Sequence, residues 1–492
     1  MYIGSQKLMQ NYDKMLLEEG YSIEELVDKA SDCLMKHMAS YKRVALLCGP
    51  GNNGADGLSL ALKLHDQGKN IHIFIFDDNK HLSIANQYYL DLCYDNKLNI
   101  TLLDYYNIET FISISEQCDA IVDAMFGFGL NSSPRGLYKA IIEEVNKLYD
   151  KDIIAVDIPT GLDCNSGEPY QSVVCASHTI TLTALKNGFL NPDSRSFTGK
   201  VILERLDIEG IHDASFLYKM MDVYDISSLI KERIFDGHKM MYGKVGMIVG
   251  CDEYKGAALL STKSAVYSGS GLVTLISDES VLSSLTTFVP EATSKIRPSV
   301  FSKDDLSAYQ ALLLGSGLGL SIDAYRYVEN VFECSSSAMV VDGDALTIVA
   351  GNLNLLKSRK YPTILTPHLG EFKRLCPFED DEDLLYIAKD FAKNYHVILV
   401  LKGPYTIVTD GDVAYRVIAG NKAMSTAGMG DVLAGMITSY LGQGYKPIDS
   451  ALIGVFTHGY IGDIIAQSSY SVIASQMIEL IPKAMNEIKN KK

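Results

Sequence analysis

The run from Gly420 to Asp431, Gly-Asn-Lys-Ala-Met-Ser-Thr-Ala-Gly-Met-Gly-Asp, holds the residues in this chain that are best suited to chemistry. An apolar helical pattern follows at once, from Val432 to Ile437. Glycines let the backbone turn so that the unpaired amides of a helix start point at one spot, where the helix dipole also favours an anion. Asp431, beside such an anion site, is placed to take a proton from a hydroxyl that attacks a phosphoryl group. The run therefore predicts phosphoryl chemistry on an alcohol.

A second glycine-rich loop, Gly49–Gly57, reads Gly-Pro-Gly-Asn-Asn-Gly-Ala-Asp-Gly and follows the predicted strand Val44–Cys48. A helical pattern begins at Leu58. A loop at the carboxyl end of a first strand is typical of dinucleotide or phosphate binding. Its two asparagines and its aspartate offer amide groups to a polar ring or oxygens to a monovalent cation. The alternative is a plain turn, in which glycine and asparagine serve only their permissive backbone angles.

Polar residues also follow two later strands of the same half. Asp123 comes directly after the apolar run Ala120–Val122, and Asp157 comes directly after Ile153–Val156. Continuous apolar runs of this kind indicate a mostly parallel sheet, whose strand ends open on one edge. Asn53, Asp123, Asp157 and Thr160 are therefore predicted to converge there. Each aspartate taken alone is equally compatible with a helix cap or a turn.

Three motifs of this half, in this order, resemble the NAD(P)H-hydrate epimerase domain. They are Gly-x-Gly-Asn-Asn-Gly-x-Asp-Gly, Asp-Ala-x-Phe-Gly-x-Gly and Asp-Ile-Pro-x-Gly-Leu-Asp, and the resemblance covers residues 1 to about 210. It implies a Rossmann-like fold that binds hydrated NAD(P)H and a potassium ion. Two positions depart from the family's usual residues: Ala55 stands where glycine is usual, and Thr160 stands where serine is common.

The resemblance also assigns residues by matching position. It implies that potassium is held by Asn53, Asp123 and Thr160. It implies that the hydrated nucleotide is contacted by Asn52, Asn53, Gly54, Ala55, Asp56, Gly127, Phe128, Gly129, Leu130, Asn131, Ser132, Ser133 and Asp157. Because Asp157 is expected to contact the ring, it is our candidate for proton transfer in epimerisation.

A second α/β pattern begins near Lys244, and polar or glycine-rich turns again follow its strands. Gly315–Gly319 follows the run Ala311–Leu314, where glycines admit a ligand close to the backbone. Lys402–Thr406 follows Val397–Leu401 and offers backbone and a cation to a nucleotide, although a simple β-turn is the better explanation of this turn taken alone. The two α/β patterns carry different glycine loops, so the chain is a fusion of unlike domains.

The second half resembles the ribokinase-like fold, over about residues 225–492. Vitamin kinases of that superfamily carry Thr-Pro-Asn-x-x-Glu, whereas this chain has Thr-Pro-His-Leu-Gly-Glu from Thr366 to Glu371. Histidine at this place matches the NAD(P)H-hydrate dehydratases, as do Tyr-x-Gly-Ala from Tyr254 and the Gly-x-Gly-Asp loop. Met429 departs from the family, because it stands where a hydroxyl residue is frequent.

By position, the resemblance implies that the hydrated nicotinamide nucleotide is touched by Ala257, Gly317, His368 and Asp431. It implies that the adenine nucleotide is bound by Lys402, Gly403, Pro404, Tyr405, Thr406 and Gly430. Family members of bacterial type use ADP as phosphoryl donor, so Mg²⁺ is expected with it and Glu371 is a candidate organiser.

Composition narrows the class of protein. With 492 residues the chain exceeds one ordinary core, and we predict domains at 1–223 and 224–492. The formal net charge of −16 argues against nucleic-acid or anionic-membrane binding. The chain shows neither an apolar run of bilayer length nor a signal-peptide pattern, and its nine cysteines form no C-x-x-C pair, so we expect a cytoplasmic protein. The helical leading segment, up to about Tyr41, packs over the first sheet or forms a subunit contact, and we expect a homo-oligomer.

The predicted function is therefore repair of hydrated NADH and NADPH, by epimerisation of the R and S hydrates and ADP-dependent dehydration of the S hydrate. ATP is an alternative donor to ADP. One rival is a ribokinase-like vitamin or sugar kinase with a regulatory Rossmann-like domain. Another rival is a nucleotide sensor without catalysis, which the intact Asp431 disfavours.

Overall fold

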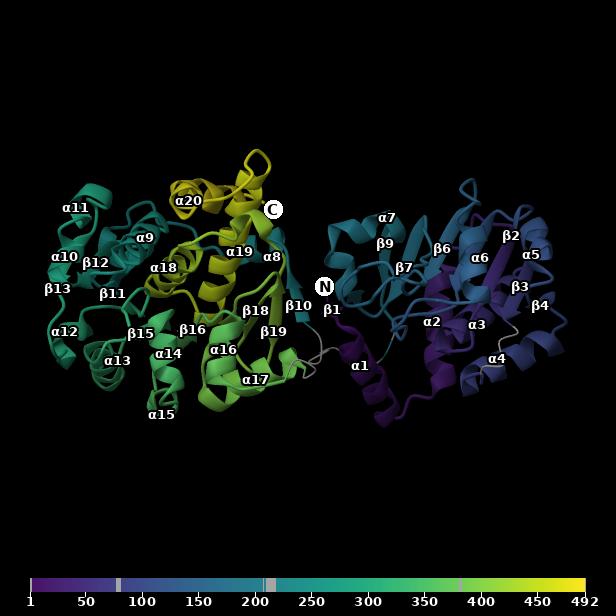
Figure 1. The fold of residues 1–492 in the computed structure, drawn as a ribbon, viewed down its shortest axis with the longest axis horizontal. Coiled ribbons are helices and arrows are strands. Elements are labelled where there is room, and N and C mark those ends of the chain that lie inside the picture. Colours follow the sequence, from purple (N-terminus) through teal and green to yellow (C-terminus); the bar gives the residue numbers. More distant parts are fainter. Residues whose placement is uncertain (1, 77–80, 207, 209–217, 380–382, 492) are drawn as a thin grey trace. The chain divides into compact units, whose positions relative to one another are not determined.

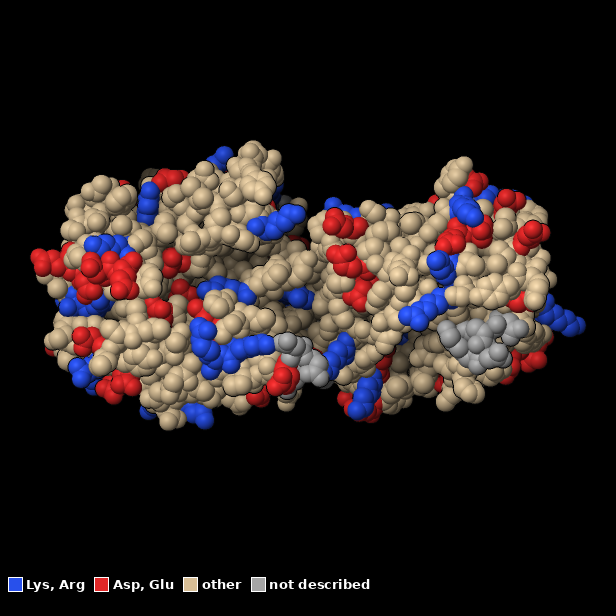
Figure 2. Space-filling model, in the orientation of Figure 1, with Lys and Arg blue, Asp and Glu red and all other residues tan. Residues whose placement is uncertain are grey.

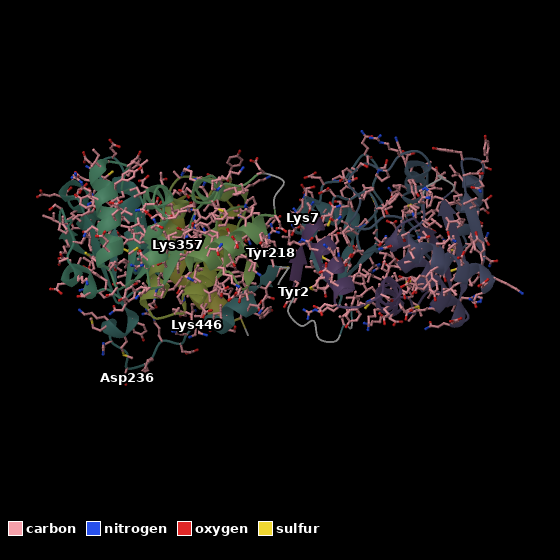
Figure 3. All side chains as sticks on the ribbon, turned by 90° about the horizontal axis from the view of Figure 1, so that it is seen from below. Tyr2, Lys7, Tyr218, Asp236, Lys357 and Lys446 are labelled. Carbon is pink, nitrogen blue, oxygen red and sulfur yellow. The ribbon has the colours of Figure 1, made fainter. Side chains whose placement is uncertain are left out.

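The computed structural model describes residues 2–76, 81–206, 208, 218–379 and 383–491. The chain divides into two compact units, Met1–Leu217 and Tyr218–Lys492. Tyr218, labelled in Figure 3, opens strand β10 (Tyr218–Met221), which pairs with β19 (Ala414–Val417) inside the second unit. The predicted domains, 1–223 and 224–492, divide the chain close to the same point, and the functional border between them stays a prediction.

The first unit contains a parallel sheet in the order β4-β3-β2-β5-β6-β7-β9. Its strands are β2 (Arg43–Cys48), β3 (Asn70–Phe76), β4 (Ile100–Leu103), β5 (Ala120–Ala124), β6 (Asp152–Val156), β7 (His178–Leu182) and β9 (Lys200–Glu204). Two further short strands, β1 (Tyr2–Gly4) and β8 (Leu185–Lys186), pair with each other in parallel. The order reverses between β2 and β5, which places a ligand crevice at the carboxyl ends of these two strands.

Helices cover both faces of this sheet (Figure 1). They are α1 (Gln6–Glu18), α2 (Ile23–Met35), α3 (Asn52–Asp66), α4 (Ile84–Asp95), α5 (Ile108–Ser115), α6 (Leu137–Val145) and α7 (Arg195–Thr198). One apolar core joins the sheet to α2, α3 and α4, through residues such as Val27 and Leu58. The other joins it to α5 and α6, through Phe111 and Ile141. Burial on both faces explains why the strands read as continuous apolar runs.

The second unit contains a larger mixed sheet in the order β13-β12-β11-β14-β15-β16-β17-β18-β19-β10. Its further strands are β11 (Lys244–Ile248), β12 (Leu272–Ser277), β13 (Thr293–Ile296), β14 (Ala311–Leu314), β15 (Ala338–Val341), β16 (Thr363–Leu365), β17 (Ile398–Leu401) and β18 (Thr406–Thr409). The strands from β13 to β17 run parallel, and β18 is antiparallel to both of its neighbours. The parallel part provides a second row of carboxyl ends on one edge.

Helices α9, α18 and α19 cover one face of the second sheet, and α13, α14, α16 and α17 cover the other (Figure 1). The helices of this unit are α8 (Val223–Leu229), α9 (Lys255–Tyr267), α10 (Glu279–Leu282), α11 (Leu285–Phe288), α12 (Lys303–Ser307), α13 (Ile322–Cys334), α14 (Asp344–Ala350), α15 (Asn354–Ser358), α16 (Leu369–Leu375), α17 (Leu384–Tyr395), α18 (Met429–Gly442), α19 (Pro447–Ala466) and α20 (Ala474–Lys489). Helix α18 is buried along almost its whole length, so its first turn is held firmly against the sheet.

The α/β prediction of two unlike sheets is confirmed, but both glycine loops are shorter than predicted. Helix α3 begins at Asn52 rather than Leu58, so Asn52–Asp56 form its first turn. Helix α18 begins at Met429, which puts Asp431 in the first turn. The reason is close packing: a Cβ at Gly54 would lie 1.9 Å from the carbonyl oxygen of Gly49. Glycine at this position lets the start of the helix lie directly against the preceding turn, rather than making a flexible loop.

Charges of both signs are mixed on the surface. On the face in Figure 2, the described Lys and Arg side chains alternate with Asp and Glu rather than gathering in one basic band. Among the residues that the structure describes, no helix is long and apolar enough to cross a membrane.

The contact between α18 and α9 generates a prediction about stability. A Cβ at Gly435 would lie 2.3 Å from the carbonyl oxygen of Ser261, whereas a Cβ at Gly256, in the first turn of α9, meets open space. Gly435→Ala should lower the free energy of unfolding by about 1–3 kcal/mol, because the two helices must move apart. The matched control Gly256→Ala should leave it unchanged or raise it by about 0.5–1 kcal/mol, because alanine loses less backbone entropy. Denaturant unfolding followed by circular dichroism measures both, and equal losses would contradict the close packing.

Candidate functional site

The first unit brings together the oxygen atoms of Asp123 and Thr160 at the ends of β5 and β6. The Thr160 hydroxyl donates to Asp123 Oδ1 at 2.7 Å, and the Thr160 amide donates to Asp123 Oδ2 at 2.8 Å. Asp123 is fully buried, and this burial raises the pKa of its carboxyl to about 6 against the opposing hydrogen bonds from Thr160 and Met125. The Phe126 amide donates to the Thr160 hydroxyl at 3.0 Å. The predicted convergence of these two residues is present.

Asn53 lies beside this pair. A Cβ at Gly127 would lie 3.1 Å from Asn53 Oδ1, so the backbone that follows β5 passes close to the amide. Within the described chain, the buried Nδ2 atom of Asn53 has no hydrogen-bond partner. A buried amide without a partner is costly, and such an atom commonly indicates a bound ligand. Asn53 therefore borders both the backbone that follows β5 and the space that a ligand would fill.

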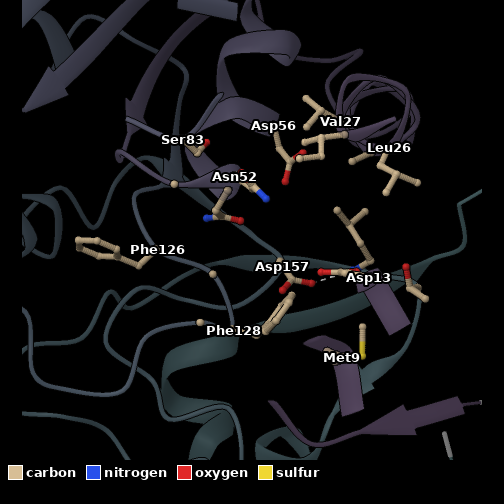
Figure 4. A pocket seen from close by; sticks show the side chains of 18 of the residues that line it. Met9, Asp13, Leu26, Val27, Asn52, Asp56, Ser83, Phe126, Phe128 and Asp157 are labelled. Atoms are coloured by element: carbon tan, nitrogen blue, oxygen red, sulfur yellow. Dashed lines mark hydrogen bonds between the residues drawn. The ribbon is translucent and has the colours of Figure 1, made fainter. Parts of the chain in front are cut away.

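A cavity of about 650 Å³ opens next to this cluster (Figure 4). Of the predicted substrate contacts, those that line it are Asn52, Asn53, Asp56, Gly127, Phe128, Gly129, Leu130, Asn131 and Asp157. Those that do not line it are Gly54, Ala55, Ser132 and Ser133. Gly54 and Ala55 instead turn into the core, where α3 meets the sheet.

Sequence reasoning missed part of the cavity wall. Asp13 and Met9, on α1, and Lys186, on β8, all line it. Isolated residues of this kind carry no motif, and only the fold brings them to the strand ends. The sequence signal for this part of the wall was Lys186, a lysine that directly follows a mostly apolar strand region.

Asp157 and Lys186 form a buried ion pair in the cavity wall. Lys186 Nζ lies 2.5 Å from Asp157 Oδ1 and donates to the Thr181 hydroxyl and to the carbonyls of Leu182 and Ala184, at 3.0–3.1 Å. These contacts occupy the ammonium protons, and the Lys186 side chain is fully buried. Asp157 also has a left-handed φ of 68°. Such strained backbone in a non-glycine residue is concentrated at functional sites.

In the second unit, the first turn of α18 presents amides without intrahelical acceptors at the site edge. Gly428 precedes it with a φ of 87°, which favours glycine and turns the chain into the helix. The free amides at the helix start and the helix dipole suit an anion. The predicted anion site is thus built at the helix start itself, and the Met429 side chain is not required for it.

Asp431 faces a group of polar residues that are largely buried. The pKa of its carboxyl is raised to about 7. Burial is the main cause and nearby Asp342 adds to it, while Lys402 and Ser316 oppose the rise. Lys402 Nζ lies 3.1 Å from Asp342 Oδ1 and 4.0 Å from Glu371 Oε2. Asp431 is therefore balanced between its charged and neutral forms near neutrality, as a general base requires.

Asp342 anchors this group, although the sequence reasoning did not single it out. It lies at the end of β15 and accepts hydrogen bonds from the Ser316 and Thr366 hydroxyls, at 2.9 Å and 2.7 Å. Burial disfavours the charge of Lys402, but Asp342 and then Glu371 outweigh this and hold the Lys402 pKa above its usual value. A Cβ at Gly430 would lie 3.3 Å from Lys402 Nζ, so the ammonium group lies against the anion loop.

His368 also has a structural role, as the N-cap of a helix, that was not predicted from the sequence. It caps α16: its Nδ1 accepts from the Gly370 amide at 3.0 Å, while the Glu371 carboxylate accepts from the His368 amide at 2.8 Å. Since Nδ1 accepts, Nε2 carries the proton in the neutral ring. Nε2 lies 3.5 Å from Glu371 Oε1 and belongs to a side chain that is 58% exposed. His368 can therefore donate to a ligand while it caps the helix.

The remaining predicted contacts divide into two groups. Ala257 and Gly317 meet, because a Cβ at Gly317 would lie 2.8 Å from the Ala257 Cβ. The segment Lys402–Thr406 is the turn of the hairpin between β17 and β18, with Gly403 and Pro404 exposed. Arg416 lies over the Tyr405 ring at 5.1 Å. The hairpin thus leaves its backbone open while Lys402 turns inward.

Comparisons with known proteins agree with this geometry. A family model described as NAD(P)H-hydrate dehydratase matches residues 245–483, and one described as YjeF-related protein N-terminus matches residues 22–188. A curated relative, the bifunctional NAD(P)H-hydrate repair enzyme Nnr of Dictyoglomus turgidum, is 30% identical over 505 residues, with 96% of each chain covered.

Two solved structures resemble the second unit. A ribokinase-like superfamily protein from Enterococcus faecalis is 26% identical with a TM-score of 0.51, and covers 57% of this chain and 99% of that chain. The ADP/ATP-dependent NAD(P)H-hydrate dehydratase from Bacillus subtilis, co-crystallised with ATP and Mg²⁺, is 26% identical with a TM-score of 0.50, and covers 55% and 99%. The second unit is thus ribokinase-like, and the first is Rossmann-like. The chain belongs to the family of bifunctional NAD(P)H-hydrate repair enzymes.

Proposed function

We propose that the two units divide the repair of hydrated NADH and NADPH between them. The first unit interconverts the R and S hydrates in the cavity beside Asp157. The second unit dehydrates the S hydrate to NAD(P)H, with conversion of ADP to AMP and phosphate. The observation that carries the second assignment is Asp431, a carboxyl with a pKa of about 7 in the first turn of α18.

Dehydration needs a better leaving group than hydroxide. Asp431 takes the proton from the C6 hydroxyl of the hydrate as that oxygen attacks the terminal phosphoryl group of the nucleotide. The amides at the start of α18 stabilise the charge that develops on the phosphoryl oxygens. The phosphate then leaves C6, pushed out by the ring nitrogen, and loss of a proton from C5 to solvent restores the dihydropyridine. The kinase rival shares the first step but would keep the phosphate ester as its product.

The substrate contacts of this unit follow from the same arrangement. Ala257, Gly317 and His368 receive the hydrated nicotinamide nucleotide, and the turn Lys402–Thr406 with Gly430 receives the adenine nucleotide. The dehydratase from Bacillus subtilis was crystallised with ATP and Mg²⁺. Among the described residues, no group of three His, Cys, Asp or Glu side chains is arranged to hold a metal ion. Mg²⁺ would enter with the phosphates, with Glu371 as an outer organiser, and would neutralise phosphate charge when bound.

For the first unit we propose a potassium ion held by Asn53, Asp123 and Thr160. The donor set fits, because it consists of hard oxygen atoms with one buried carboxylate for a single positive charge. The Asn53 Nδ2 atom without a partner is a donor, so it supports a substrate acceptor beside this corner, and Asn53 Oδ1 is the atom that would face the ion. The ion, when bound, supplies a fixed positive charge beside the substrate, and Thr160 and Asp123 orient each other for it.

We also propose a cytoplasmic location and a homo-oligomeric state for this enzyme. The absence of C-x-x-C pairs among nine cysteines supports the location. Of the two roles open to the leading segment, packing over the first sheet is the one that α2 takes, and the homo-oligomeric state stays a prediction.

Replacing Asp431 tests the assignment of the dehydratase. Asp431→Asn removes the base but keeps the shape, so dehydration of the S hydrate with ADP should fall by at least about 100-fold, while epimerisation is unchanged. Return of dihydronicotinamide absorbance measures dehydration, and chromatography of the two hydrates measures epimerisation. The control Asp412→Asn, whose side chain is 77% exposed and pairs with Lys393, should leave both unchanged. Dehydration at the normal rate in Asp431→Asn would refute the role of this residue.

The acidity of Asp431 predicts the pH dependence of dehydration. A general base acts when it is ionised, so kcat/KM for the S hydrate should rise with pH through about 7, the pKa of Asp431, and level off above it. In Asp431→Asn the residual rate should lose this rise. A wild-type profile that falls across the same range would contradict Asp431 as the base.

Potassium binding is tested by stability rather than by activity. At equal ionic strength, KCl should raise the melting temperature of the first unit by roughly 2–4 °C relative to tetramethylammonium chloride. Thr160→Ser keeps the hydroxyl and should keep the shift, whereas Thr160→Val should lose it. The same shift in Thr160→Val as in the wild type would exclude this site.

A further inference from the structure

Helix α1 is held at the epimerase cavity by a pairing that begins at the chain's first strand. Strand β1 runs parallel to β8, with Gly4 opposite Lys186. Ser5 then caps α1, because its hydroxyl accepts from the Leu8 amide at 3.3 Å. Along α1, Met9 and Asp13 are one turn apart and both line the cavity. The fold thus brings Asp13 to the same place as the Asp157–Lys186 pair.

The titratable side chains that face the cavity come from separate elements. Among the described lining residues they are Asp13 on α1, Asp56 on α3, Asp157 after β6 and Lys186 on β8. Figure 4 shows the side chains of Asp13 and Asp157 pointing into the same part of the cavity. Their charges interact, and Asp56 interacts with both of them. Three carboxyl groups thus share one lysine.

The lysine is not shared equally. Lys186 lies 2.5 Å from Asp157 and has its protons occupied, so this lysine is paired with Asp157. Among the described residues, Asp13 has no such ion pair. It is exposed at the cavity, where partial loss of water and then the charge of Asp157 raise the pKa of its carboxyl to about 7, while Lys186 opposes this rise. Two carboxyl groups in such different environments, one paired with a lysine and one open to the cavity, form a typical acid–base pair.

Asp56 is less suited to moving a proton. It lies deeper, and burial followed by the charges of Asp157 and Asp13 raises the pKa of its carboxyl well above the usual value. The charged form of Asp56 is thus disfavoured in the cavity wall, whereas Asp13 borders the open cavity, where it can exchange its proton with solvent.

We propose that Asp13 is a catalytic acid–base residue of the epimerase, the proton donor that acts opposite the Asp157 carboxylate. This inference rests on the proposed function and identifies a second proton-transfer group for it. The two groups come from different walls of the cavity, a helix and a strand end, so they approach a bound ring from different elements.

The chemical step balances with these two groups. Asp13 gives its proton to the C6 hydroxyl, the C6–O bond breaks with both electrons leaving on water, and the lone pair of the ring nitrogen forms a double bond to C6. Water then adds to the other face of C6, the double-bond pair returns to nitrogen, and Asp157 takes the proton from the added oxygen. Exchange of protons with solvent restores Asp13 and Asp157. For the opposite hydrate the two carboxyl groups exchange roles: Asp157, protonated in the preceding turnover or through solvent, gives the proton, and ionised Asp13 accepts one.

The test uses the full chain and purified R hydrate without nucleotide. Asp13→Asn should slow epimerisation about 100-fold and abolish the dependence of its rate on pH near 7, and Asp13→Glu should recover part of the rate. In water enriched in oxygen-18, the wild type should exchange the C6 oxygen with each epimerisation, and Asp13→Asn should lose this exchange together with the rate. Dehydration of the S hydrate with ADP should stay normal in every variant, which shows that the second unit is intact, and an unchanged circular dichroism spectrum and melting temperature show that the first unit is folded.

The control is Glu18→Gln, on the same helix with a side chain that is 67% exposed, and it should leave epimerisation unchanged. An Asp13→Asn rate within about threefold of the wild type, or an unaltered pH profile with only a higher KM, would overturn the proposal for Asp13. Wild-type chain that does not epimerise at all would instead overturn the proposed function of the first unit, so the two failures are distinguishable.

Discussion

In each unit a lysine pairs with a buried aspartate at the carboxyl ends of parallel strands, and a further carboxyl lies beside the pair. Lys186 pairs with Asp157 in the first unit, and Lys402 pairs with Asp342 in the second. A buried carboxylate without a partner is expensive, so one lysine stabilises one aspartate and leaves the other carboxyl short of charge compensation. In both units that other carboxyl, Asp13 or Asp431, has a pKa near 7. The acid–base chemistry of the protein depends on this unequal sharing.

The surrounding fold fixes where these groups lie. The start of α18 is placed by Gly428, with its left-handed backbone, and by the burial of the helix that follows. The start of α3 is placed by Gly54, which lets the helix touch the turn before it. Both glycines act by close approach, and each leaves helix amides or side chains facing a strand-end crevice. The two units thus use the same physical device for different reactions.

Much of the fold and of the two sites could be predicted from the sequence, because turns at strand ends have recognisable local patterns of residues. The loops around Asn53 and Asp431 are readable as glycines next to polar residues, and the convergence of Asp123 with Thr160 follows from a parallel sheet. Asp13, Lys186 and Asp342 could not be found in this way. These residues reach the sites through pairings between distant segments, such as β1 with β8, and no local spacing in the sequence indicates such pairings. The cap formed by His368 was also missed, because histidine rarely takes the place of serine in a capping box.

In the proposed dehydration, the oxygen atom of the C6 hydroxyl leaves the hydrate as part of the phosphate. The most direct measurement uses S hydrate labelled with oxygen-18 at C6, in a single turnover with excess enzyme and ADP, followed by mass spectrometry of the phosphate. Hydrate recovered unreacted from the same mixture reports any label lost by exchange. We predict that the phosphate carries the label in the proportion that the recovered hydrate retains. Unlabelled phosphate beside labelled residual hydrate would show that the oxygen leaves as water and would contradict the role of Asp431.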